Sequence, residues 1–218
     1  MAIALLGLYW QKVILPVVPD FTHLQGPPDR TFAAGFDDQW TNVMFVGRVI
    51  PNKKFEQIIR AFHVYRTRHN PRSRLLLVGS YSGFEKYRAM LQGLVARLGT
   101  PDVHFLGHVS NEELTALYDV ADLFLCASEH EGFCVPLVEA MAMDVPVLAY
   151  SAAAVPDTLG GAGVQFAPKD LEYAAELLGM LAFEDSPREE VLAGQRQRLR
   201  DFGDPVIQQR LASVMSGF

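Results

Sequence analysis

From Asn42 onward, the sequence alternates between short apolar runs and longer stretches with helical periodicity. Strands and helices that alternate in this way are typical of a parallel sheet with helices packed on both of its faces. The apolar runs are continuous, with no polar residue at every second position, as expected for strands covered on both faces. We therefore predict a doubly wound α/β domain with a parallel sheet of about six strands. The strands are expected at residues 43–47, 74–79, 103–107, 122–127, 145–149 and 163–166.

The intervals between these runs carry signals for helices. Residues 55–69 place their apolar side chains on one stripe, as an amphipathic helix does. Ser110 and Glu113 have the spacing of a capping box, which predicts the start of a further helix. The remaining helices are expected at residues 84–98 and 136–143, with two or three more between 170 and 216, broken near 186–187 and again near 204–205.

Length and charge narrow the class of protein. The chain of 218 residues suffices for one sizeable domain, and half of its residues are hydrophobic. The formal net charge is −6 and no cluster of Lys and Arg stands out, which argues against a nucleic-acid partner. Cys126 and Cys134 form no CxxC pair, so they predict neither a zinc site nor a disulfide framework and suit a reducing cytoplasm.

The apolar start of the chain does not resemble a membrane anchor. Residues 1–10 are too few to span a bilayer, and they lack the basic start of a signal peptide. We predict a cytoplasmic protein without a transmembrane segment, and a peripheral membrane contact stays open. Residues 1–40 are irregular and are expected to form a segment separate from the α/β domain of residues 41–218.

The stretch Ser128 to Ala142 (SEHEGFCVPLVEAMA) joins a predicted strand to a predicted helix and holds two glutamates. In an open parallel sheet, such loops form the ligand crevice. The N–H groups of Cys134 and Val135, at the start of the helix, would suit a phosphate. Glu139 could accept hydrogen bonds from two ribose hydroxyls. These features together indicate a site for a nucleotide sugar.

The same stretch is where a family resemblance appears. Glu131-Gly132-Phe133, followed by Pro136 and by Glu139-Ala140-Met141-Ala142, resembles the E-x7-E signature of the large retaining glycosyltransferase family with the two-domain GT-B fold (glycosyl transferase group 1). The resemblance runs from about Val43 to about Phe166. It implies the Rossmann-like, C-terminal half of a GT-B fold, which binds the donor nucleotide sugar.

A second motif follows the first predicted strand. Gly47-Arg48 and then Lys53 resemble the family's G-R-x4-K, whose Arg and Lys hold the diphosphate of the donor. A leaving nucleoside diphosphate gains negative charge as the glycosidic bond breaks, and an Arg fork with a Lys charge offsets it without a metal. The family commonly has Gly after the Lys, where this chain has Lys54, so the choice between Lys53 and Lys54 stays open.

The resemblance assigns further roles. Glu131 would lie near the transferred sugar, Glu139 would bind the ribose, and backbone groups at Val109 would contact the base. Cys134 stands where the family most often has Gly, and a position that needs positive φ would resist Cys. His108 and His130 are interpreted as surface histidines. The predicted catalytic residues are Glu131, Arg48 and Lys53; the predicted nucleotide-sugar contacts are Gly47, Val109, Gly132, Phe133, Cys134, Val135 and Glu139; no metal ligand is predicted.

The resemblance also implies an activity. The whole enzyme would transfer a sugar from a UDP-, GDP- or similar nucleotide to an acceptor glycan, lipid or small molecule, with no further cofactor. The acceptor would be held by an N-terminal domain that this chain lacks, so the isolated chain is expected to bind nucleotide but to be nearly inactive. Exposed apolar surface where that domain docks would favour homodimers.

Three other classes of protein would suit parts of the same sequence pattern. A non-catalytic nucleotide-sugar module would share the fold, and titration followed by a donor-hydrolysis assay separates it from an enzyme. An epimerase or phosphorylase of the same fold would need further groups that the sequence does not identify. A receiver-like signalling domain would need an acidic cluster at the end of the first strand, where this chain carries Arg48 and Lys53.

Overall fold

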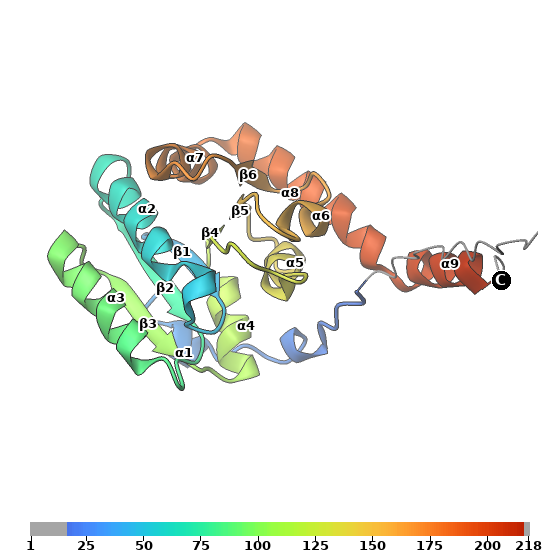
Figure 1. Ribbon diagram of the computed structural model, residues 1–218, viewed down its shortest axis with the longest axis horizontal. Helices are drawn as coiled ribbons and strands as arrows, with labels where there is room; N and C mark the ends of the chain where they lie inside the picture. Colours follow the sequence, from blue (N-terminus) through green and yellow to red (C-terminus); the bar gives the residue numbers. More distant parts are fainter. Residues whose placement is uncertain (1–16, 216–218) are drawn as a thin grey trace, which may run out of the picture.

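A computed structural model describes residues 17–215, and at its centre is a six-stranded sheet in the order β3-β2-β1-β4-β5-β6 (Figure 1). Every neighbouring pair of strands is parallel. This confirms the predicted fold class, a Rossmann-like α/β sheet of six strands. The strands are β1 Thr41–Val46, β2 Ser73–Val78, β3 Val103–Gly107, β4 Leu123–Cys126, β5 Val147–Tyr150 and β6 Val164–Phe166.

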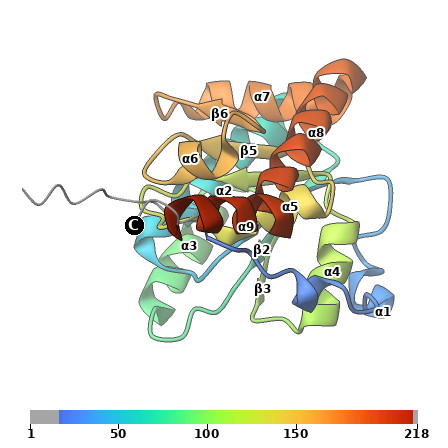
Figure 2. The same cartoon turned by 90° about the vertical axis from the view of Figure 1, so that its right-hand side faces the viewer.

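Helices cover both faces of the sheet. The helices α2 and α3 lie on one side, and α4 and α5 lie on the other (Figure 1). Turned by 90°, the structure has β6 and α7 at one edge and β3, α3 and α4 toward the other (Figure 2). The helices are α1 Arg30–Ala33, α2 Phe55–Arg68, α3 Glu85–Leu98, α4 Asn111–Asp119, α5 Val135–Ala142, α6 Val155–Leu159, α7 Leu171–Phe183, α8 Asp185–Leu199 and α9 Asp204–Met215, with 3-10 turns η1 Thr22–Leu24, η2 Pro51–Lys53 and η3 Arg200–Phe202.

Local signals in the sequence account for some of the element boundaries. Ser110 and Glu113 form the predicted capping box at the start of α4, each side chain bonded to the other residue's N–H. The break in the C-terminal tail falls at Glu184, earlier than expected from Pro187. That proline instead lies in the first turn of α8, where its missing N–H removes no helical bond.

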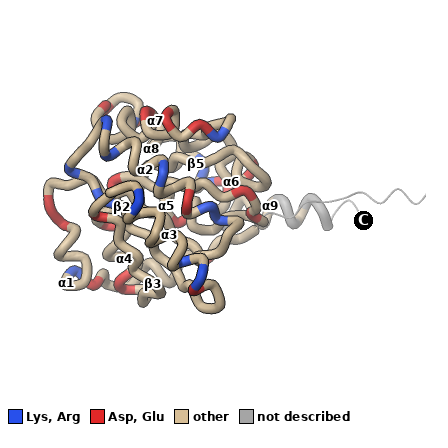
Figure 3. The backbone as a smooth tube through the Cα atoms, turned by 60° about the vertical axis from the view of Figure 1, so that its left-hand side comes forward, with Lys and Arg blue, Asp and Glu red and all other residues tan. Residues whose placement is uncertain are grey.

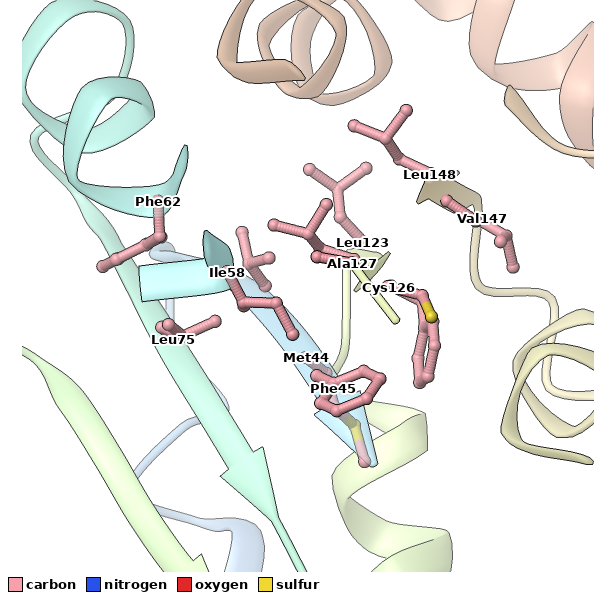
Figure 4. Packing of buried hydrophobic residues seen from close by; sticks show 14 of the residues in the cluster. Met44, Phe45, Ile58, Phe62, Leu75, Leu123, Cys126, Ala127, Val147 and Leu148 are labelled. Atoms are coloured by element: carbon pink, nitrogen blue, oxygen red, sulfur yellow. The ribbon is translucent and has the colours of Figure 1, made fainter. Parts of the chain in front are cut away.

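The apolar side chains of the central strands form the core. Met44 and Phe45 of β1, Leu123 of β4 and Ile58 of α2 are all buried in this core (Figure 4). Phe45 and Phe55 meet edge to face at 5.1 Å between ring centroids. The centre of the sheet is therefore rigid, and it holds the loops that leave its carboxyl edge in fixed positions.

The strand order places the switch point of the sheet between β1 and β4, and we call the region outside the carboxyl ends of these two strands the crevice. The connections that follow these two neighbouring strands lead to helices on opposite faces, α2 after β1 and α5 after β4. Ligands of open α/β sheets bind at such a switch point, outside the carboxyl ends of the strands. The loops of residues 47–54 and 127–134 border this crevice.

The segment before β1 packs against the domain. The η1 turn and α1 both contact α4, and the N–H of Asp29 donates to the carbonyl of Glu112 at 2.9 Å. Leu24 is buried in the common core. The first strand, β1, begins at Thr41, and residues 1–16 lie outside the described part of the chain, so the domain boundary expected near residue 40 stays a prediction. Within residues 17–215, no helix combines the length and apolar character required to cross a bilayer.

Candidate functional site

Two loops meet at the crevice between β1 and β4. We name residues 47–54 the β1 loop and residues 127–134 the β4 loop. The N–H of Glu129 donates to the carbonyl of Asn52 at 3.1 Å, and the Asn52 amide donates to the carbonyl of His130 at 3.3 Å. These two hydrogen bonds join the loops.

The contact between Lys53 and Glu131 is the most buried ion pair at the crevice. Lys53 Nζ lies 2.6 Å from Oε1 and 2.7 Å from Oε2 of Glu131. The side chains are only 16% and 7% exposed. Two residues assigned to catalysis from different motifs therefore touch each other, as a shared site requires. The ammonium has a third N–H, which can donate to another acceptor.

Lys54 points to a different carboxylate. Its Nζ lies 3.0 Å from Glu129 Oε2, and this pair is more exposed than the inner one. Lys169 also reaches Glu129, at 3.2 Å, and donates to the carbonyl of Ala127 at 2.7 Å. The hydrogen bond from Lys54 lowers the pKa of Glu129, so this carboxylate stays ionised. Of the two lysines, Lys53 is thus the one that enters the crevice.

Arg48 is exposed just after β1, and among residues 17–215 its guanidinium has no hydrogen-bond or ion-pair partner. With Lys53, Lys54 and Lys169, it makes four cationic side chains against the two carboxylates Glu129 and Glu131. The two loops and the adjoining Lys169 therefore carry a local excess of positive charge, although the molecule is acidic overall and its charged residues are interspersed along the backbone (Figure 3). Such an excess favours an anionic ligand.

Gly79 and Gly47 bring the ends of β2 and β1 together. A Cβ on Gly79 would lie 1.9 Å from the carbonyl oxygen of Gly47, and Gly79 has φ +144°, so only glycine fits. Next to this contact is a hollow of about 450 Å³ at the ends of β2 and β3. Val109, predicted to contact a base, is not among its lining residues, which are Ser80, Tyr81, Ser82, Glu85, Leu106, Gly107 and His108.

The β4 loop ends in a left-handed residue at the start of α5. Cys134 has φ +65° and precedes the first helical residue, Val135. This explains why Gly is common here, and it shows that Cys is accommodated. Neither of these two residues' N–H groups has a partner among the described residues, and both stand at the positive end of the helix dipole. The N–H pair is available to an anion.

Neighbouring residues support the β4 loop unequally. The carbonyl of Phe133 accepts a hydrogen bond from the Thr158 hydroxyl. The ring of Phe133 meets the ring of Phe202 edge to face, with 5.7 Å between the ring centroids. Gly132 is exposed, and a Cβ there would meet nothing within 4 Å. Phe133 therefore anchors the loop, whereas Gly132 is not required by packing.

Glu139 lies apart from the lysines, on the buried side of α5. Its Oε2 accepts a hydrogen bond from the Tyr118 hydroxyl at 3.1 Å, and its Oε1 lies 2.9 Å from His23 Nε2. Burial, with the charge of Glu139, raises the pKa of Tyr118 well above its usual range, so Tyr118 remains a donor. The carboxylate is thereby oriented from two sides and retains lone pairs for further donors.

Several of these contacts could not be identified from the sequence. His23 and Lys169 are far from their partners along the chain and belong to no recognised motif. Tyr118 falls within a predicted helix, where a buried aromatic residue is ordinary. His108 and His130 are exposed, as interpreted from the sequence.

Comparisons with known proteins identify the family of this chain. The model of the family "Glycosyl transferases group 1" matches residues 30–193, more than half of the chain. O-antigen chain mannosyltransferase B of Escherichia coli is 34% identical over 149 residues, which cover 67% of this chain and 38% of that protein. The MMP alpha-(1->4)-mannosyltransferase of Mycolicibacterium hassiacum is 40% identical over 111 residues, covering 49% of this chain and 26% of that protein.

Solved structures share the fold. Anabaena HepE in complex with UDP and glucose superposes with a TM-score of 0.74 at 24% identity, covering 91% of this chain and 55% of that one. The C-terminal domain of a glycosyl transferase group 1 family protein from Francisella tularensis has a TM-score of 0.66 at 22% identity, covering 80% of this chain and 93% of that one. The chain thus spans about half of one neighbour and almost all of an isolated C-terminal domain. By its sequence match over residues 30–193, this chain belongs to the glycosyl transferase group 1 family.

Proposed function

We propose that residues 41–218 form the donor-binding half of a retaining glycosyltransferase, and that residues 1–40 are part of the crossing from an N-terminal domain. The observation that carries this proposal is the buried contact of Lys53 with Glu131 at the switch point of the sheet. It joins the two motifs that the family uses for the diphosphate and for the transferred sugar.

The proposed roles follow from charge and geometry. Lys53 keeps one N–H on Glu131 and donates another to the departing diphosphate, while the exposed Arg48 contacts the diphosphate from the other side. The free N–H groups of Cys134 and Val135 complete the anion site. Glu131, fixed by Lys53, accepts hydrogen bonds from hydroxyls of the transferred sugar. These cations offset the charge of the leaving group without a required metal.

The nucleoside would occupy the remaining parts of the crevice. Glu139, oriented by Tyr118 and His23, accepts hydrogen bonds from the two ribose hydroxyls. The hollow beside Gly107 has the position and size for a base, with Val109 at the start of the segment that follows. Gly47, Gly132 and Phe133 shape the walls between these subsites.

We propose a hexose donor, with mannose as the first sugar to test. The relatives named above are mannosyltransferases, and a structural neighbour was solved with UDP and glucose. The acceptor would be a glycan, lipid or small molecule held by the other domain. Because transfer depends on orienting two substrates, worth roughly 7–11 kcal/mol at best, the isolated chain should be nearly inactive.

The test is a calorimetric titration of the purified chain with UDP, GDP and their mannose- and glucose-linked forms. We expect one of the diphosphates to bind, and Arg48→Ala to weaken it about tenfold, since a charge-assisted contact to a diphosphate is lost. The same variant should leave the affinity for the unphosphorylated nucleoside unchanged. Binding of no nucleotide, or equal binding by wild type and Arg48→Ala, would contradict the proposed site.

A second measurement separates an enzyme from a binding module. Fusing the chain to an acceptor-binding N-terminal domain should raise transfer from the level of the isolated chain toward rates typical of enzymes, about 1–1000 per second. Donor binding without transfer in the fused protein would indicate a non-catalytic module. Sedimentation of the isolated chain tests the predicted homodimer.

A further inference from the structure

The two cysteines of the chain meet beside the β4 loop. Cys126 is the last residue of β4, and Cys134 is the residue that caps α5. Their Sγ atoms and a carboxylate oxygen of Glu131 all lie within 4.8 Å of one another. Both thiols are buried, with Cys126 0% and Cys134 6% exposed, and Cys126 is visible among the core side chains in Figure 4. Three groups able to bind one ion thus converge from different elements.

We propose that Cys126, Cys134 and Glu131 form a binding site for a thiophilic divalent cation of the Zn²⁺ class, and that the cation binds in competition with the Lys53 ammonium for Glu131. A tetrahedral ion with Zn–S bonds of about 2.3 Å sets its two sulfurs about 3.8 Å apart. The three groups would therefore have to close by about 1 Å at most. Thiolate and carboxylate are ligands that zinc accepts together.

The surroundings support an ion at this place. Ser128, close to Cys126, has a fully buried hydroxyl without a hydrogen-bond partner among residues 17–215. It offers a fourth ligand atom, in addition to water. Binding one cation releases the two thiol protons to the buffer, and no electron is transferred.

A disulfide between the same thiols is the less favoured outcome. Redox-active cysteines are generally exposed, whereas these are enclosed by β4 and α5. The convergence of a carboxylate with the two thiols is what distinguishes an ion site from a redox pair.

Competition with Lys53 predicts how the affinity for the cation changes when the lysine is removed. Glu131 is held by Lys53 at 2.6 Å and 2.7 Å, so an ion that takes its carboxylate must weaken that pair. Removing the ammonium should therefore strengthen cation binding, which is the opposite of its effect on an anionic ligand. This prediction does not depend on the proposed sugar transfer.

The experiment titrates the reduced chain with Co²⁺ and Cd²⁺ and records thiolate-to-metal charge-transfer absorption, with Zn²⁺ competition to rank affinities. We expect one ion per chain in wild type, no charge-transfer band in the double variant Cys126→Ala with Cys134→Ser, and at least tenfold weaker binding in Glu131→Gln. Glu129→Gln, the neighbouring carboxylate of the same loop, is the matched control and should bind like wild type. Lys53→Ala should bind about tenfold more tightly, and Lys54→Ala should not.

Each result decides the proposal. Absence of a thiolate band in wild type, or a band that needs only one of the two cysteines, would overturn the site. Equal affinity of Glu131→Gln and Glu129→Gln would remove the carboxylate from it. Unchanged affinity in Lys53→Ala would refute the competition. Circular dichroism of every variant verifies the fold, and Cys134→Ser alone keeps the test available should the double variant fail to fold.

Discussion

The two loops that border the crevice end in the same left-handed backbone conformation but carry different side chains there. Each ends in a left-handed residue just before a helix, Lys54 with φ +54° before α2 and Cys134 with φ +65° before α5. Lys54 directs its side chain outward to Glu129, while Cys134 directs its thiol inward to Cys126. The conformation that favours glycine is therefore retained, and each side chain is used for a separate contact.

The loops also carry an inner and an outer ion pair. Lys53 and Glu131 are buried and joined by two short hydrogen bonds, whereas Lys54 and Glu129 are at the surface. Adjacent lysines in the sequence thus occupy unlike electrostatic environments. Burial, not residue type, decides which of them can respond strongly to a ligand.

The largest effect should come from breaking the inner pair. In Lys53→Ala we expect donor-nucleotide affinity to fall about 100-fold, because a buried charge that faces the diphosphate is lost. The free energy of unfolding should fall by about 3 kcal/mol, since Glu131 is left buried without a partner. Lys54→Ala should change affinity less than about threefold and stability by less than about 1 kcal/mol. Calorimetry measures the nucleotide affinity and urea unfolding measures the stability. Equal effects of Lys53→Ala and Lys54→Ala would contradict the difference between the inner and the outer ion pair.

Glu139, the carboxylate proposed to bind the ribose, belongs to neither loop, and its substitution should give the next largest effect. Glu139→Gln is expected to weaken binding of the nucleoside diphosphate about tenfold, because charged hydrogen bonds to two hydroxyls become neutral ones. With a 2′,3′-dideoxy analogue, wild type and variant should bind alike. A loss of similar size with the analogue would mean that Glu139 acts through the fold and not through the ribose.

The shared left-handed conformation can be tested by comparing glycine with alanine at each loop end. Lys54→Gly should be more stable than Lys54→Ala by about 1 kcal/mol, and Cys134→Gly more stable than Cys134→Ala by a similar amount, since only glycine escapes the steric cost of positive φ. Chemical denaturation of the four variants measures the two differences. A difference near zero at either position would show that its backbone relaxes.

The smallest effect concerns pH and the outer pair. The pKa of Glu129 is lowered from 4.5, chiefly by its hydrogen bond from Lys54. Its stabilising contribution is therefore complete above pH 4.5 and is lost as the pH falls through the lower folded value. We expect less than about 1 kcal/mol for so exposed a pair, and none of it in Glu129→Gln. Unfolding curves between about pH 3 and 6 would reveal it, and an identical slope in the variant would contradict the assignment.

The sequence predicted the elements that depend on local pattern. Apolar runs marked all six strands, although His104 interrupts the run of β3 and Gln165 that of β6, and Ser110 with Glu113 marked the start of α4. The pattern around Glu131 and Glu139 also placed Glu131 on the loop after β4 and Glu139 in the helix that follows. These features depend on neighbours along the chain, so a single sequence contains them.

Contacts between distant segments could not be predicted in this way. The pairing of His23 with Glu139 and of Lys169 with Glu129 depends on how α4, α7 and the N-terminal segment pack. Nor did the sequence show that Lys53 turns inward and Lys54 outward, since both are lysines on one short turn. These pairings and side-chain directions depend on which residues are buried next to each other, and that is known only once the fold is assembled.

Gln195 of α8 has a consequence for where this domain can be cut. Its side chain is wholly buried, accepting from the N–H of Val147 at 2.8 Å and donating to the carbonyl of Val145 at 2.9 Å. The stretch recognised by the family model ends at residue 193, before this glutamine. A protein that ended at residue 193 would leave the N–H of Val147 and the carbonyl of Val145 without these hydrogen bonds at the start of β5. A chain made for expression should therefore extend beyond the end of the family match.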